Sequence, residues 1–281
     1  SDRTVTFPRP VAYFLVLFNG TLLPYRLVGI EAGAVTRGHF VQSNMMIEIQ
    51  GEGAYVDTLR KHGVIVDHRE RREMIREALC AEAERLGGTV VEDGELLDTV
   101  TFLVERPWVV ACEFEREFLK IPDIVLVTEM KEHQKYFAVR SGNGALMSSF
   151  LVVSNNPPTD NIRKGNERVI SARFTDGSFF FNEDRKKPLS AFVGPLKDVL
   201  FHKELGSIYD KVLRMRHIAG AIAGRLKLDD AVGKKIERAV ELSKADLNTA
   251  MVYEFTSLQG KMGRIYALMD GEDADVADAI D

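Results

Sequence analysis

The residues best suited to chemistry in this sequence lie between Met130 and Leu189. The run Lys-Glu-His-Gln-Lys occupies 131–135, and a stretch rich in charged and phenylalanine residues follows at 163–186. Histidine and glutamate exchange protons as general acids and bases, whereas clustered lysine and arginine neutralise phosphates. The segment therefore suits either acid-base catalysis or the binding of a polyanion.

A self-contained catalytic centre is not visible in the sequence. There is no GxxxxGK[ST] loop, and Gly142-Asn143-Gly144 lacks the third glycine and the helix entry of a dinucleotide loop. The six histidines are scattered, and none belongs to an HExxH motif or a His-Asp pair. We predict no metal site. Asp246 would hold a metal only if histidines converged on it, so we predict a buried carboxylate that ties helices together.

Basic side chains occur in five clusters, three of them close to the aromatic stretch. A charge run is usually a solvated face, but several runs beside one helix favour a local phosphate site. The phenylalanines of that stretch could stack on bases, yet Ile170, Phe174 and Phe181 recur at helical spacing and predict a core stripe. The clusters are Arg60–His62, His68–Arg72, Arg163–Arg168, Arg185–Lys187 and Arg214–His217.

Bulk charge does not argue for a nucleic-acid partner. The 281 residues carry a net charge of −5, but the last twelve contain six acids and no base, so residues 1–269 hold 37 bases against 36 acids. No apolar run approaches the roughly 18 residues of a membrane span. The two cysteines lie outside any CxxC spacing. We expect a protein of the reducing cytoplasm that has no membrane partner.

Strands are predicted near the start of the chain. Residues 10–18 and 21–28 are rich in apolar side chains and flank Asn19-Gly20, a dipeptide that suits a two-residue hairpin. Residues 64–66 form a shorter apolar run that we also predict as a strand. The region is therefore expected to contribute to a sheet.

Two capped helices and a strand should follow. Asp67 with Glu70 resembles a capping box, and the helix after it should end at Gly87-Gly88. Asp93 can cap a second helix that continues until Pro107, followed by a strand at 108–114. The buried stripe of the first helix is predicted to comprise Ile75, Leu79, Ala83 and Leu86.

The remainder of the chain is expected to change from mixed to helical structure. Pro122 should open a helix that continues to about His133, and strands at 136–140 and 146–154 should form a hairpin. The absence of a βαβ rhythm favours an α+β fold. We place a domain boundary near 190, with an α+β domain at 1–190 and an all-α domain at 191–281. Helices are predicted at 163–186, 205–224, 229–245, 245–256 and 258–269.

Eight sequence blocks resemble the beta subunit of the bacterial tetrameric glycyl-tRNA synthetase, in the family's order and across nearly the whole chain. MKEHQKYF, GNERV..AR and LQG..GR.YA are together highly specific. The blocks are FPRPVAYFLVLFNG (7–20), GIEAGAVTRGH (29–39), KHGVIVDHRERREMI (61–75), EMKEHQKYFAV (129–139), FLVVSNN (150–156), GNERVISARFTDGSFFFNEDRKKPL (165–189), KELGSIYDKVLRMR (203–216) and KADLNTAMVYEFTSLQGKMGRIYAL (244–268).

This resemblance implies a part in the ATP-dependent attachment of glycine to tRNA(Gly), within a heterotetramer of two alpha and two beta subunits. In that family the alpha subunit holds the class II aminoacylation site and uses ATP and Mg, while the beta subunit chiefly binds tRNA. The chain itself is then expected to have no catalytic residue and no cofactor, and to be an internal fragment of a beta subunit.

The resemblance also implies domain types. Residues 1–190 would correspond to a domain like the B3/B4 editing domain of phenylalanyl-tRNA synthetase, and residues 191–281 to a degenerate HD-type helical domain. The His-Asp dipeptide of active HD domains is absent, so hydrolase activity is not implied.

Three hypotheses follow for the Met130–Leu189 segment. The first is a tRNA-binding and assembly module that is inactive alone. The second is an editing-like hydrolase of mischarged tRNA, with His133 or Glu132 as general base. The third is a scaffold whose Lys131, Arg168 and Asp184 pair internally. For the first, charge and clustering predict tRNA contacts at Lys131, His133, Lys135, Arg163, Lys164, Arg168, Arg173 and Lys186.

Overall fold

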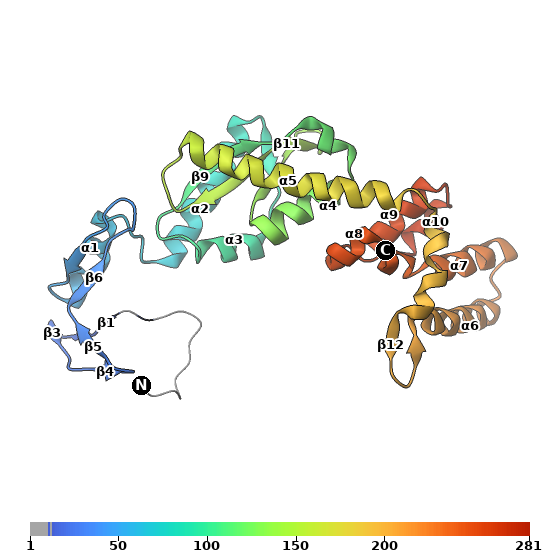
Figure 1. The fold of residues 1–281 in the computed structure, drawn as a ribbon, viewed down its shortest axis with the longest axis horizontal. Helices are drawn as coiled ribbons and strands as arrows, with labels where there is room; N and C mark the ends of the chain where they lie inside the picture. Colours follow the sequence, from blue (N-terminus) through green and yellow to red (C-terminus); the bar gives the residue numbers. More distant parts are fainter. Residues whose placement is uncertain (1–10, 12) are drawn as a thin grey trace. The chain divides into compact units, whose positions relative to one another are not determined.

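A computed structural model describes residue 11 and residues 13–281 of the chain (Figure 1). Helices alternate with several small sheets, in agreement with the predicted α+β class. Contacts divide the chain into two compact units, 1–113 with 135–167, and 114–134 with 168–281. None of the limits of these units falls at residue 190. The boundary between a B3/B4-like and an HD-like domain near residue 190 stays a prediction.

A four-stranded antiparallel sheet forms the centre of the first unit. Its strands lie in the order β8, β10, β11, β9. The hairpin of β10 and β11 confirms the predicted pair of strands, and Gly144 in its turn has a φ of 85°. The strand predicted at 108–114 is also confirmed. The bounds are β8 Gly88–Val90, β9 Trp108–Glu113, β10 Phe137–Ser141 and β11 Leu146–Ser154.

Strand β8 was not foreseen, because Gly87-Gly88 reads as a helix stop. Gly87 does end the preceding helix, with a φ of 78°. Gly88 instead pairs with Ser141 in the sheet. A Cβ on Gly88 would come within 2.6 Å of the Arg140 carbonyl oxygen, so a larger side chain would force the two strands apart.

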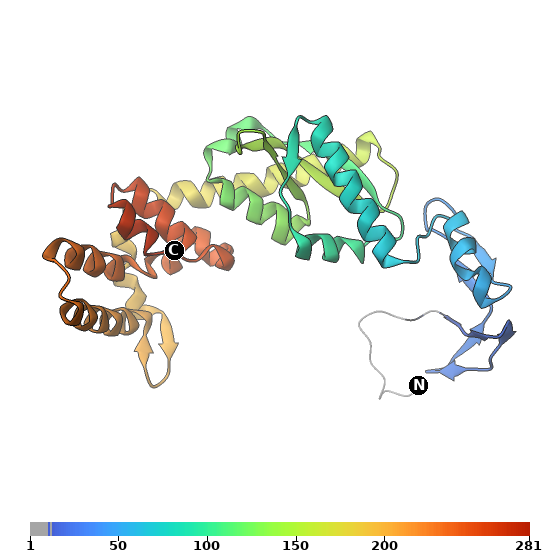
Figure 2. The same cartoon turned by 180° about the vertical axis from the view of Figure 1, so that it is seen from behind.

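Two helices pack together over this sheet, and both begin as predicted (Figure 2). The Asp67 carboxylate accepts from the Arg69 amide at the start of α2 (His68–Arg85), and Asp93 accepts from Leu96 in α3 (Gly94–Thr101). The Glu70 side chain binds Arg60 and not the Asp67 amide, so the predicted capping box is wrong while the predicted cap residue is confirmed. Helix α3 ends at Thr101, so its predicted extension to Pro107 is wrong. The buried core comprises Ile75, Leu79, Ala83, Leu96, Leu97, Val100, Val104, Phe137, Val139 and Leu151.

The described strands in the N-terminal part of this unit are all short. The hairpin at Asn19-Gly20 is confirmed, with φ angles of 46° and 73°, but each predicted flanking strand is broken in two. Residues 10 and 12 of the first one lie outside the described residues. The strand predicted at 64–66 is wrong, since that segment joins no sheet. The bounds are β1 Phe14–Leu15, β2 Leu17–Phe18, β3 Thr21–Leu22, β4 Arg26–Leu27, β5 Ile30–Gly33, β6 Val35–Arg37, β7 Met46–Glu48 and α1 Tyr55–Lys61.

The second unit is mainly helical. Helix α4 (Asp123–Thr128) continues into a π-helical turn at Glu129–Gln134, which confirms a helix from Pro122 to about His133. The all-α prediction for 191–281 is wrong at one place, because β12 (Leu200–His202) and β13 (Gly206–Ser207) form a hairpin. The other helices are α5 Asp160–Asp184, whose residues from 168 belong to this unit, α6 Ile208–Leu226, α7 Asp230–Leu242, α8 Ala250–Glu254, α9 Lys261–Met269 and α10 Ala274–Asp278.

Asp246 confirms the expectation of a buried carboxylate that joins helices. Its side chain is fully buried, and Oδ2 accepts from the Gly260 amide at 2.6 Å and the Gly263 amide at 3.2 Å. Burial raises the pKa of this carboxyl, while the two amides act against that rise. The carboxylate thereby fixes the start of α9.

The two cysteines should differ sharply in reactivity. Cys112 is buried in β9, and burial raises the pKa of its thiol to about 12, whereas Cys80 on α2 is half-buried. Because the thiolate is the reactive form, iodoacetamide at about pH 8 should modify Cys80 alone in the folded chain and both cysteines in urea. Mass spectrometry counts the adducts. Equal rates at the two positions in the folded chain would contradict the buried placement of Cys112.

Candidate nucleic-acid interface

The eight predicted tRNA contacts are divided between the two units. The first unit contains Lys135, Arg163 and Lys164. The second contains the other five, which are Lys131, His133, Arg168, Arg173 and Lys186. Each set is therefore considered within its own unit, except that Lys164 and Arg168 both lie on the continuous helix Asp160–Asp184.

In the first unit, polar side chains fix the start of α5 to the sheet. The Tyr136 hydroxyl donates to Asn166 Oδ1 at 2.6 Å, and the Glu113 amide donates to Glu167 Oε1 at 3.1 Å. Burial raises the pKa of Tyr136 to about 12, so this hydroxyl stays protonated at neutral pH. Asn166 and Glu167, which belong to the GNERV..AR motif, are thus engaged in positioning helix α5.

The basic residues of the first unit differ in how much of their charge is available. Arg163 lies 3.0 Å from Asp160 and 3.8 Å from Glu167, which partly neutralise it. Lys164 is exposed and, among the described residues, forms no salt bridge. Lys135 is half-buried at the entrance to β10 and has a left-handed φ of 60°. Lys164 is therefore the best placed of the three to meet a phosphate.

A second pair of motif blocks meets elsewhere in the same unit. His39 is fully buried, and its Nε2 lies 2.6 Å from the Asn155 carbonyl oxygen. The His39 Nδ1 accepts from the Val41 and Gln42 amides, so the proton belongs on Nε2. The Asn155 side chain accepts from the Glu105 amide at 2.7 Å. These two residues join loops, a role that their spacing in the sequence does not reveal.

In the second unit, the π-helical turn after α4 contains a buried acid. Glu129 is 2% exposed, its Oε1 lies 3.9 Å from Arg173 Nε, and its Oε2 has no hydrogen-bond partner among the described residues. Burial raises the pKa of Glu129, and His133 and Arg173 act against that rise. The His133 ring is exposed and packs edge to face against Phe255 at 5.5 Å. Its proposed role as a general base stays a prediction.

Replacing Glu129 with glutamine should stabilise the chain more at neutral than at acidic pH. Because the folded-state pKa is raised, the wild-type chain loses stability as pH rises from the ordinary glutamate value through the raised one. Glutamine carries no charge and removes that loss. Urea unfolding at about pH 4 and about pH 7 measures the difference. Glu183→Gln, at a partly exposed acid of helix α5, is the control. A stabilisation that shrinks toward neutral pH would contradict the expectation.

The predicted core stripe of the aromatic stretch is confirmed within this unit. Ile170, Phe174 and Phe181 are buried, and the Phe174 ring packs edge to face against Phe114 at a centroid separation of 4.9 Å. Phe179 is 60% exposed. The stripe therefore belongs to packing, and Phe179 is the member of this phenylalanine cluster that is most exposed to solvent.

Asp184 at the end of α5 supports the scaffold hypothesis for one of its three residues. The side chain is 5% exposed. Its oxygens accept from the Ala250 amide at 2.8 Å, the Met251 amide at 3.0 Å and the Tyr266 hydroxyl at 2.9 Å. Asp184 thus satisfies the first amides of α8 and contacts α9. It does not pair with Arg168.

The exposed bases of α5 are the remaining candidates. Arg168 is exposed and, within the described part of the chain, forms no salt bridge. It follows Lys164 by four residues on one helix, so the two side chains belong to the same helix face. Arg173 is paired with Glu129, and Lys186 with Glu183. Lys164 and Arg168 therefore have the basic groups that are most available to a polyanion.

Two features are absent from residue 11 and residues 13–281. In that part of the chain, no group of three or more histidine, cysteine or acidic side chains is arranged to hold a metal ion. No helix in it is long and apolar enough to cross a membrane.

Comparisons with known proteins agree in the name they give. A family model described as the glycyl-tRNA synthetase beta subunit matches residues 1–281. The chain is 42% identical over 282 residues to the glycine–tRNA ligase beta subunit of Desulforapulum autotrophicum, covering 100% of this chain and 41% of the relative. It is 43% identical over 276 residues to that of Syntrophus aciditrophicus, covering 98% of this chain and 40% of the relative. It is 42% identical over 281 residues to that of Bacillus subtilis, covering 99% of this chain and 41% of the relative. The chain thus spans about two fifths of the length of these relatives.

Proposed function

The chain belongs to the glycyl-tRNA synthetase beta subunit family, and from that membership we propose that it supports the ATP-dependent attachment of glycine to tRNA(Gly). It does so by binding tRNA and by assembling with an alpha subunit, in a cytoplasmic heterotetramer. The alpha subunit performs the chemistry with ATP and Mg. This chain contributes no catalytic residue.

The exposed Lys164 and Arg168 on one face of α5 are the observation that carries the proposal of tRNA binding. The other motif residues nearby are engaged in positioning, as the hydrogen bonds of Asn166, Glu167 and Asp184 show. Two bases that form no salt bridge with the described residues, held one turn apart on a long helix, suit adjacent phosphates of a nucleic-acid backbone. The other six predicted residues remain proposed tRNA contacts, after Lys164 and Arg168 in importance. They are Lys131, His133, Lys135, Arg163, Arg173 and Lys186.

The division of labour between subunits has a direct test. This chain alone, with glycine, tRNA(Gly), ATP and Mg, should show no glycine-dependent ATP turnover. Glycylation should require the alpha subunit together with a complete beta subunit. Turnover by this chain alone would overturn the proposal. Hydrolysis of mischarged tRNA by this chain, lost in His133→Ala, would instead favour the editing-like activity.

The domain types remain part of the proposal. We infer a B3/B4-like domain for residues 1–190, because an antiparallel sheet with helices over one face suits that type. We infer an HD-like domain for residues 191–281, which contain α6 to α10. Neither domain is assigned a reaction.

A further inference from the structure

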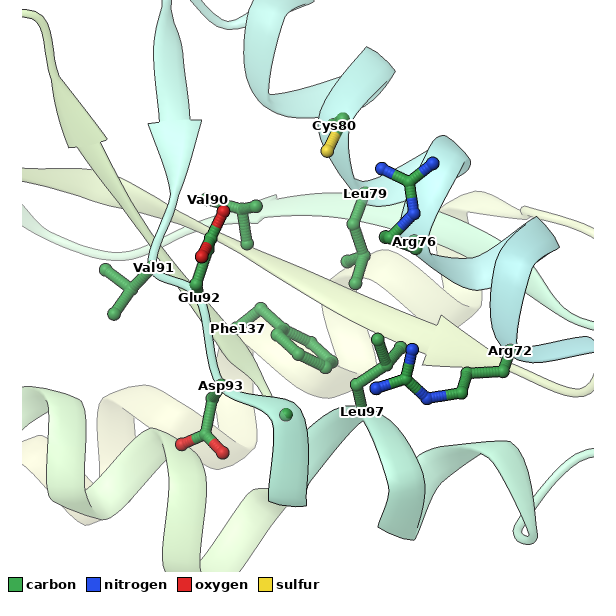
Figure 3. Close-up of a pocket in the computed structure, with 11 residues that line it drawn as sticks. Arg72, Arg76, Leu79, Cys80, Val90, Val91, Glu92, Asp93, Leu97 and Phe137 are labelled. Atoms are coloured by element: carbon green, nitrogen blue, oxygen red, sulfur yellow. The ribbon is translucent and has the colours of Figure 1, made fainter. Parts of the chain in front are cut away.

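A cavity in the first unit lies between α2, the segment after β8, and the start of α3. Its volume is about 240 Å³. Leu79, Leu97 and Phe137 give it an apolar floor that is continuous with the hydrophobic core (Figure 3). Since sites for drug-sized ligands have volumes of roughly 300–1,000 Å³, this cavity suits a smaller molecule.

Charges of opposite sign stand on two sides of the cavity. Arg72 and Arg76 border it from α2, and Glu92 and Asp93 border it from the segment between β8 and α3 (Figure 3). The Asp93 carboxylate caps α3 by accepting from the Leu96 amide, whereas Glu92 is exposed. The cavity thus has donors on one wall and an acidic side chain on the other.

The two arginines keep donors beyond their known pairs. Arg72 Nε donates to Asp98 Oδ1 at 2.6 Å, and Arg76 binds Glu73 through Nε and Nη2. Both pairs are exposed, since the side chain of Arg72 is 40% exposed and that of Arg76 is 49% exposed. Such surface pairs are weak and exchange partners readily. Both Nη groups of Arg72 and Nη1 of Arg76 lie outside these hydrogen bonds, and a guanidinium fork suits a carboxylate.

We propose that this cavity is a binding site for a free amino acid with an apolar side chain. The side chain fills the apolar floor, the α-carboxylate accepts from Arg72 and Arg76, and the α-ammonium group donates to Glu92. A zwitterion matches both charged walls, whereas a simple anion or cation meets one wall of like charge. The proposal concerns binding alone and is independent of the tRNA-binding role.

Cys80 provides a reporter inside the site. It lines the cavity, and the other cysteine, Cys112, is 1% exposed. Iodoacetamide modification of Cys80 at about pH 8 is followed while L-leucine is titrated, with calorimetry in parallel to count binding that leaves the thiol accessible. L-leucine should slow the modification and give a saturable binding heat. Absence of both effects would overturn the proposal.

Three truncated molecules test each part of the assignment. 4-Methylpentanoate lacks the ammonium group, 3-methylbutylamine lacks the carboxylate, and glycine lacks the apolar side chain. Each should bind about tenfold or more weakly than L-leucine, because each forfeits one contact. Equal binding of either charge-deleted molecule would exclude the zwitterion, and equal binding of glycine would exclude the apolar floor.

Substitutions of residues that line the cavity test whether L-leucine binds there. Arg76→Gln and Glu92→Gln should each weaken L-leucine binding by about tenfold. Arg85→Gln is the matched control, because Arg85 is an exposed arginine of the same helix paired three residues away with Glu82. It should leave the affinity unchanged. L-leucine binding that survives both cavity substitutions would show that the site lies elsewhere and would reject the assignment.

Discussion

Replacement of Asp184 with alanine should destabilise the second unit by about 3 kcal/mol or more. Three donors would lose their shared acceptor: the partly buried amide of Ala250, the buried amide of Met251 and the buried hydroxyl of Tyr266. Each stranded buried donor costs about 1–3 kcal/mol. Urea unfolding followed by circular dichroism should show a lower midpoint with an unchanged slope.

Two companion variants sharpen the Asp184 result. Asp184→Asn keeps the shape but has one accepting oxygen, so its loss of stability should be intermediate. Asp176→Ala alters an exposed acid of the same helix and should change stability by about 0.5 kcal/mol or less. If Asp184→Ala were no more destabilising than Asp176→Ala, the buried carboxylate would not hold α8 and α9 together.

Reversal of both Lys164 and Arg168 to glutamate should weaken tRNA binding by about tenfold or more at low salt. Each reversal removes a cation that is available to a phosphate and adds a repelling charge. Neither side chain forms a salt bridge within residue 11 and residues 13–281, so the fold itself should be little affected. Filter binding or fluorescence anisotropy with labelled tRNA(Gly) measures the loss.

A control of equal charge change separates this face from general electrostatics. Lys234→Glu with Lys261→Glu alters two exposed lysines, on α7 and at the start of α9, by the same total charge. The control pair should weaken binding by much less than the α5 pair. Equal losses would mean that net charge governs tRNA affinity, and the assignment of α5 would fail.

Local chemistry explains which elements could be predicted from the sequence. Asp67 and Asp93 start helices because each carboxylate accepts from an amide of the first turn, a rule that needs only nearby residues. The Asn19-Gly20 turn and the stripe of Ile170 and Phe174 follow equally local rules. These features depend on residues that are close in the sequence and not on distant parts of the chain.

Elements that depend on distant partners could not be predicted. Gly88 belongs to a strand only because β10 lies beside it, and residues 64–66 join no sheet although their composition suits one. The hairpin of β12 and β13 is short and lacks an alternating pattern. Pairing across the sequence decides these cases, so composition alone misleads.

The dense polar segment separates into two groups of side chains once contacts are known. Asn166, Glu167, Glu129 and Asp184 are occupied in hydrogen bonds or ion pairs, and Asp184 receives three donors from residues more than 60 positions away. Their sequence spacing gives no sign of those partners. Exposed basic residues could be predicted as a class, but the pairing of Arg163, Arg173 and Lys186 with acids could not.

The salt dependence of tRNA affinity is the most direct test of the proposed role. The logarithm of the binding constant should fall linearly with the logarithm of salt concentration, since each neutralised phosphate releases counterions. The Lys164→Glu/Arg168→Glu variant should have a slope smaller by about two, one for each lost phosphate contact. An affinity that does not vary with salt, or an identical slope in this variant, would contradict binding of tRNA through this face of α5.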